Sequence, residues 1–347
     1  MQTLWFILVG AMLGMYVVLD GFDLGAGAIH LFAAKTDEER RLILRAIGPV
    51  WDGNEVWIIA AGGTLFFAFP VLYASSFSGF YLPLIIVLWL LIIRGVAIEL
   101  RSRFSNTVWA SFWDGLFFLG SALLAIFYGA ALGNVLRGVP LNSSGYFFEA
   151  LWTDFNPFSS NPGILDWYTI LIGLLALTTL TAHGATYIAV KTPNPLSARS
   201  RRIARIFWLA TLVLLIPGTI TTWLVQPQIS TNYFSHPWGF IFPLLVLGDL
   251  IAMGYFHFKQ RDLPAFFSSC TFILGMLASA AFGLYPLVLP AVSRINSLTI
   301  QNASSSQYGQ TVGLIWWIIG MVLASVYFIL TYRLFWGKVR VTNSEGY

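Results

Sequence analysis

The chain has 347 residues, of which 57% are hydrophobic and only 10% are charged, whereas about a quarter of the residues in a soluble domain are charged. Apolar runs of about 20 residues, the length that crosses a bilayer, recur along the whole sequence. This composition excludes a soluble multidomain protein and predicts one integral membrane domain of all-α, polytopic architecture over residues 1–347. The net charge of +4 does not indicate nucleic-acid binding, because the basic segments also carry acids and lack a basic fold module.

The apolar runs predict about nine membrane-spanning helices. The first run carries two acids and no basic n-region, so we expect a retained helix rather than a cleaved signal peptide. A short similarity between residues 27–36 and 184–192 suggests a parallel repeat of two four-helix units, 1–135 and 164–290, followed by a ninth helix at 311–336. The predicted spans lie near residues 4–33, 52–74, 77–98, 113–135, 164–190, 205–226, 238–258, 264–290 and 311–336.

The basic residues predict the orientation of these helices. Of the 19 Lys and Arg residues, 17 lie on one side of the predicted membrane, either in alternate connections or at the C-terminal end, which carries Arg333, Lys338 and Arg340. Only Arg137 and Arg294 lie on the other side. Because cytoplasmic loops are enriched in Lys and Arg, the N-terminus is expected outside and the C-terminus in the cytoplasm.

Acidic residues gather on the cytoplasmic side of this topology. Asp20 and Asp23 lie inside the first apolar run, and Asp52 and Glu55 open the second. A carboxylate in hydrocarbon is costly, so it pairs, lines water or takes up a proton. Asp20 and Asp23 are three residues apart and share one face of a helix. The outer halves of the helices are nearly free of titratable groups, which predicts a one-sided proton inlet rather than a through-going pore.

Each acid also has a simpler explanation. Asp20 and Asp23 could form interhelical salt bridges, with the neighbouring glycines allowing close helix packing. Asp52 could cap the second helix, because acids are favoured at helix N-termini. Glu55 is expected to pair with an arginine on the inner side, such as Arg94.

His183 is the best placed histidine for binding haem, because it lies deep in an apolar run among small neighbours. A packed or proton-relaying histidine is the favoured interpretation, and we predict neither haem ligands nor a metal site in this chain. The single cysteine, Cys270, excludes a disulfide framework and a thiolate cluster.

Three segments, 20–25, 48–57 and 77–81, together resemble subunit II of the cytochrome bd-type quinol oxidases, cyanide-insensitive variants included. The later segments 282–286 and 297–305 fit the same family. The resemblance spans essentially the whole chain and is strongest in its first hundred residues. It implies a bacterial cytoplasmic (inner) membrane enzyme that couples quinol oxidation to the reduction of O₂ to water, using protons from the cytoplasm.

In this family the partner, subunit I, holds haems b and d and oxidises the quinol, while subunit II has two four-helix bundles plus a ninth helix and binds no haem. The resemblance allows a structural quinone and a small accessory subunit. It assigns a proton path to Asp23 and Asp52, with Trp51 and Asn54 as neighbours in the second motif. From their positions in the sequence we add Asp20 to this path and Glu55 to its supporting residues. A proton-coupled secondary transporter and a purely structural assembly subunit remain alternatives.

Overall fold

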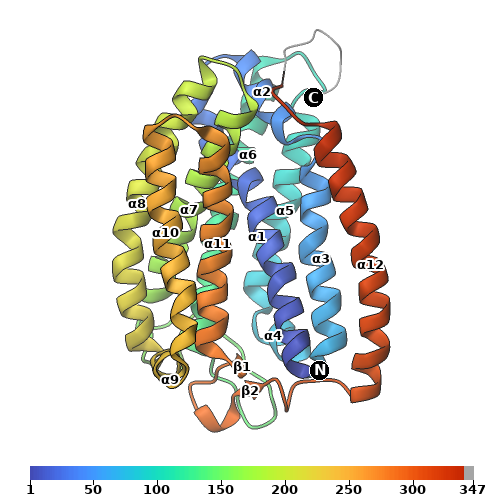
Figure 1. Ribbon diagram of the computed structural model, residues 1–347, viewed down its shortest axis with the longest axis vertical. Coiled ribbons are helices and arrows are strands. Elements are labelled where there is room, and N and C mark those ends of the chain that lie inside the picture. The colour runs from blue at the N-terminus through green and yellow to red at the C-terminus, as the bar shows by residue number, and fades with distance from the viewer. Residues whose placement is uncertain (340–347) are drawn as a thin grey trace.

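Long helices run roughly side by side along the longest axis of the molecule (Figure 1). A computed structural model describes residues 1–339 of the chain, and Arg340, which contributed to the predicted orientation, lies outside the described residues. The helices are α1 (Gln2–Ala33), α2 (Asp37–Ile47), α3 (Trp51–Ala68), α4 (Pro70–Gly79), α5 (Tyr81–Leu100), α6 (Thr107–Arg137), α7 (Trp167–Lys191), α8 (Leu196–Val225), α9 (Pro227–Ser235), α10 (Ile241–Phe258), α11 (Asp262–Leu284) and α12 (Gln307–Leu334).

Eight helical segments in the described part of the chain are long and apolar enough to cross a membrane. They are α1, α5, α6, α7, α8, the stretch Pro237–Phe258 that contains α10, α11 and α12. The prediction of a multi-pass, all-α membrane protein is therefore confirmed, with eight such helices rather than nine. The missing one is α3, because its first two turns hold Asp52, Asn54 and Glu55.

The predicted span 52–74 is wrong in its length, because α3 ends at Ala68 and α4 starts at Pro70. Phe69 between them has φ −133° and ψ 66°, outside the helical region. A proline disfavours the helical conformation of the residue before it and removes a backbone donor, yet it fits the first position of a new helix. The span predicted at 264–290 likewise ends at Leu284, two residues before Pro286.

Helix α1 lies in the centre and packs against α3, α6, α7 and α11. Its closest approach to α7 is at Gly25, where an added Cβ would lie 2.7 Å from the backbone nitrogen of Gly184. The close packing that the sequence suggested for these glycines therefore joins α1 to α7. At one edge of the bundle, α12 lies beside α3 (Figure 1).

The two ends of the bundle carry small elements that the apolar pattern did not predict. At the end where α1 starts, β1 (Leu287–Leu289) pairs antiparallel with β2 (Leu298–Thr299), and two short 3₁₀ turns, η1 (Pro237–Phe240) and η2 (Arg294–Asn296), complete the connections. At the opposite end, α2 fills the first basic loop and buries Leu42, Ile43 and Leu44. By the predicted orientation these are the outer and inner ends, and these names are used below.

Candidate functional site

One arginine joins two acids in the inner half of the bundle. The Arg94 guanidinium of α5 donates to Asp20 Oδ1 of α1 and to Glu55 Oε1 of α3, at 2.6 Å each. Asp20 and Arg94 are fully buried, whereas the side chain of Glu55 is 22% exposed. The predicted interhelical salt bridge is therefore present for Asp20, and the expected pairing of Glu55 with Arg94 is confirmed.

Asp23 has different surroundings, although it is only one helical turn from Asp20. Its Oδ2 accepts a hydrogen bond of 2.8 Å from the Asn54 amide, and Tyr332 of α12 donates to Asn54 Oδ1 at 3.0 Å. Asp23 is fully buried, and its Oδ1 has no hydrogen-bond partner among the described residues. Asp23 thus contacts an amide where Asp20 contacts a cation.

Asp52 lies at the exposed inner start of α3, outside the buried network. Asp52 is not the N-cap residue, which is Val50, and no side-chain hydrogen bond caps this helix, but Asp52 lies in the first turn, where the helix dipole favours an acid. Asp52 and Glu55 are three residues apart on α3, so their side chains lie on the same face of the helix. Trp51 packs against Gly95 of α5, where an added Cβ would lie 3.4 Å from the indole ring. Asp52, Glu55 and the Arg94–Asp20 pair therefore follow one another from the surface inward.

A second buried cluster surrounds Asp114 of α6. It contacts His30 of α1 at 2.6 Å, Arg40 of α2 at 2.8 Å and Arg101 at 2.9 Å. Arg101 contacts it a second time through Nη2 at 3.2 Å, so this carboxylate, which is 1% exposed, makes four polar contacts that join α1, α2 and the end of α5 to α6. Asp114 therefore pairs with arginines of the inner side, and this contact fixes α2 on the bundle.

His183 is a cross-link between helices. Its Nδ1 lies 2.6 Å from Ser269 Oγ of α11, its Nε2 lies 2.9 Å from the Val18 carbonyl of α1, and its ring stacks on Phe266. Because both ring nitrogens are engaged, His183 does not fit the role of an axial haem ligand. A relay role for His183 stays a prediction.

Buried charge also occurs at the outer end, where the sequence led us to expect almost none. Arg137 at the end of α6 contacts Glu149 and Asp166, and all three residues are at most 6% exposed. Arg137 could have been singled out, because an arginine on the side poor in positive charge needs a local reason. The sequence also did not predict Arg94 as a bridge between two acids or Tyr332 as the partner of Asn54.

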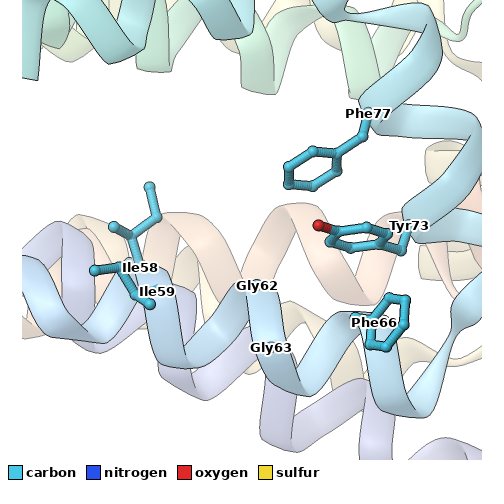
Figure 2. Close-up of a pocket in the computed structure, with 7 residues that line it drawn as sticks. All are labelled: Ile58, Ile59, Gly62, Gly63, Phe66, Tyr73 and Phe77. Carbon is cyan, nitrogen blue, oxygen red and sulfur yellow. The ribbon is translucent and has the colours of Figure 1, made fainter.

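A shallow groove of about 540 Å³ lies between α3 and α4, and no acid lines it. Figure 2 shows Ile58, Ile59 and Phe66 of α3 facing Tyr73 and Phe77 of α4, with two glycines forming the floor. The only polar side-chain atom in this lining is the Tyr73 hydroxyl. The groove therefore suits an apolar chain rather than a charged or strongly polar ligand.

Comparisons with known proteins agree with this architecture. The model of the family "Cytochrome bd terminal oxidase subunit II" matches residues 1–335. The cytochrome bd-I ubiquinol oxidase subunit 2 of Escherichia coli K12 is 33% identical, with 99% of this chain and 96% of that protein covered. A probable cytochrome oxidase subunit 2 of Haemophilus influenzae is 31% identical, over 98% and 95%.

A solved bd oxidase from Geobacillus thermodenitrificans contains a chain of the same fold, with a TM-score of 0.73 over 96% of this chain and 98% of that one. The sequence identity of that pair is 16%, so it shows the fold alone. The family match and the full-length relatives decide membership: this multi-pass membrane protein belongs to the cytochrome bd terminal oxidase subunit II family.

Proposed function

We propose that this chain is the haem-free subunit II of a bacterial quinol oxidase and supplies cytoplasmic protons for the reduction of O₂ to water. The relatives named as ubiquinol oxidase subunits support the reaction. The observation that carries the proton role is the connected series from exposed Asp52, through part-exposed Glu55, to fully buried Asp20 and Asp23. Ubiquinol is the substrate proposed for the complex, by analogy with these relatives.

The roles of the acids follow from their partners. Arg94 contacts both Asp20 and Glu55, so its positive charge is shared between two acids. Asp20 and Asp23 each have one oxygen without a hydrogen-bond partner among the described residues, but only Asp23 has an uncharged amide in place of a cation as its partner, so it is the buried carboxyl group best suited to take up and release a proton. Asp52 serves as the surface entry, Asn54 orients Asp23, and Trp51 packs the start of α3 on α5.

The same proposal includes nine spans, with α3 as the ninth. It lies between α1 and α12 along the bundle axis (Figure 1), and its polar first turns contact the buried arginine. Helices α1, α3, α5 and α6 would form the first unit, α7, α8, α10 and α11 the second, and α12 the additional helix. The distribution of Lys and Arg supports an outside N-terminus and a cytoplasmic C-terminus.

Haems b and d belong to subunit I in this proposal. The geometry of His183 supports that assignment, because both of its ring nitrogens are engaged. A structural quinone does not fit the groove of Figure 2 well, because a quinone ring has two carbonyl groups and the lining offers the Tyr73 hydroxyl as its one side-chain donor. The proposed partners are subunit I, a small accessory subunit and inner-membrane lipid.

The test uses the assembled oxidase with Asp23→Asn or Asp52→Asn in this subunit. A reduced-minus-oxidised spectrum establishes that haem-containing complex is present, and quinol-driven O₂ consumption and proton uptake are then measured on equal amounts of complex. We expect both variants to assemble and to turn over at least about tenfold more slowly, since a positioned proton-transfer group contributes about 10²–10⁴-fold in many enzymes. Glu38→Gln, an exposed cytoplasmic acid of α2, is the matched control.

Two outcomes would decide against the proton role. Normal turnover and normal proton uptake in both assembled variants would show that protons reach the partner by another route. Loss of assembled complex in both would favour a purely structural subunit, in which these acids serve only as packing pairs.

A further inference from the structure

A charged cluster at the outer end has no part in the proposed proton inlet. Arg137 Nη2 donates to Glu149 Oε1 at 2.8 Å, and Arg137 Nη1 donates to Asp166. The same guanidinium also donates to the Gly163 carbonyl at 2.8 Å and to Asn134 Oδ1 at 2.7 Å. Asp166 is in turn committed to capping α7, where its Oδ1 accepts from two backbone amides at 2.8 Å each.

The charges of this cluster do not balance. Two carboxylates face one guanidinium, Glu149 and Asp166 are 0% exposed, and Glu149 Oε2 is buried with no hydrogen-bond partner among the described residues. Burial raises the pKa of Glu149 to about 7, since the attraction of Arg137 is offset in part by the repulsion of Asp166. A buried carboxylate with one unpartnered oxygen is a place where a proton binds.

The cluster fixes the outer loop, residues 138–166, onto the bundle. Next to Glu149, the amides of Ile164 and Leu165 donate to the carbonyls of Ala150 and Leu151 at 2.9 and 2.8 Å. Phe147 is buried and its ring packs edge-on against Phe80. Five aromatic side chains of the same loop are at least half exposed: Tyr146, Phe148, Trp152, Phe155 and Phe158. Of these, Tyr146 and Trp152 are of the two types that favour the membrane–water interface.

We propose that Arg137, Glu149 and Asp166 form an outward-facing proton-binding site that latches the outer loop onto α6 and α7. With a proton on Glu149, one guanidinium faces one carboxylate and the cluster is neutral. Without that proton an extra negative charge is buried, and the base of the loop opens so that water can hydrate it. Among the described residues, the charged groups facing Glu149 are Arg137 of α6 and Asp166 at the start of α7.

The direction of the effect follows from proton linkage. Glu149 binds its proton more tightly in the docked loop than in an open one, where its pKa would be close to the ordinary value of about 4.3. The docked loop is therefore fully stabilised below about pH 4.3, and this stabilisation is lost as the pH rises towards about 7. External acid is expected to tighten the loop and external alkali to loosen it.

Hydrogen exchange of the complete oxidase complex tests the latch. Amide exchange of peptides from the outer loop is compared between the wild type and Glu149→Gln at a series of pH values from about 5 to about 8.5. Taking the ratio at each pH removes the intrinsic pH dependence of exchange. At the alkaline end of this range, we expect the loop of the wild type to open at least about tenfold more often than the loop of Glu149→Gln. Asp154→Asn, an exposed acid of the same loop, is expected to match the wild type.

The latch is wrong if the wild type and Glu149→Gln give a constant ratio across this range. It is also wrong if Asp154→Asn abolishes the pH dependence. Should Glu149→Gln not assemble, α9 (Pro227–Ser235) at the same end of the wild-type protein serves as internal reference, and a ratio between the exchange of the outer loop and of α9 that does not change with pH overturns the proposal.

Discussion

Asp20 and Arg94 are 74 residues apart in the sequence, yet both are fully buried and their side chains meet at 2.6 Å between α1 and α5. The same guanidinium reaches Glu55 of α3 at 2.6 Å. One cation thus fixes the relative position of three helices and neutralises charge in the inner half of the bundle. Asp23, one turn further along α1, accepts a hydrogen bond from Asn54 instead.

From the ion pairs of Arg94 with Asp20 and Glu55, we expect Arg94→Gln to lower the amount of assembled oxidase. Removing one partner of a buried ion pair typically costs about 3–5 kcal/mol, because the remaining charges stay buried and uncompensated. Arg94→Lys should rescue assembly only in part, since an ammonium group cannot present the planar guanidinium that reaches two acids. Haem content per membrane protein is the measurement. Normal haem content in Arg94→Gln would contradict a stabilising role for the bridge.

The two acids of α1 are expected to respond differently to the same change. Asp20→Asn removes a partner of Arg94 and should reduce assembly, because Arg94 then keeps only Glu55. Asp23→Asn keeps a hydrogen-bonding group next to Asn54 and should assemble but turn over slowly. Assembly and turnover per haem are measured for both variants. The distinction between the two acids fails if both lose assembly to the same extent.

The approach of α1 to α7 predicts that Gly25→Ala disrupts the bundle. An added methyl group would collide with the backbone of Gly184 and with the Leu180 carbonyl, and backbone atoms cannot move aside as a flexible side chain can. Gly10→Ala in the same helix is the control, because nothing lies within 4 Å of its added Cβ. The midpoint of thermal unfolding should fall for Gly25→Ala and stay close to that of the wild type for Gly10→Ala.

His183→Phe tests whether this histidine is a cross-link or a relay. The substitution keeps an aromatic ring against Phe266 but leaves Ser269 Oγ and the Val18 carbonyl without this partner. We expect a loss of stability of about 1–3 kcal/mol, which is the usual cost of unsatisfied buried polar groups. The pH profile of turnover should not change. A shifted pH profile in a stable variant would instead assign proton relay to His183.

Several features could be predicted from the sequence because they depend on local composition. The apolar runs identified an all-α membrane protein, and the motifs around Asp20, Asp23 and Trp51 indicated the family. Helix ends were less predictable, since Pro70 divides one expected span and the amphipathic α2 occupies an expected loop. A hydropathy pattern does not reveal short polar helices, because such helices are stabilised mainly by packing on the tertiary surface.

The partner of each acid was decided by the tertiary structure alone. Asp20 and Asp23 lie on the same side of α1 and look equivalent in the sequence, but Asp20 faces α5 and its arginine while Asp23 faces α3 and its asparagine. The sequence determined by itself that buried acids lie in this membrane protein and on which side they are expected. Which acid is neutralised depends on distances of a few ångströms between helices, because ion pairing and hydrogen bonding act only at contact range.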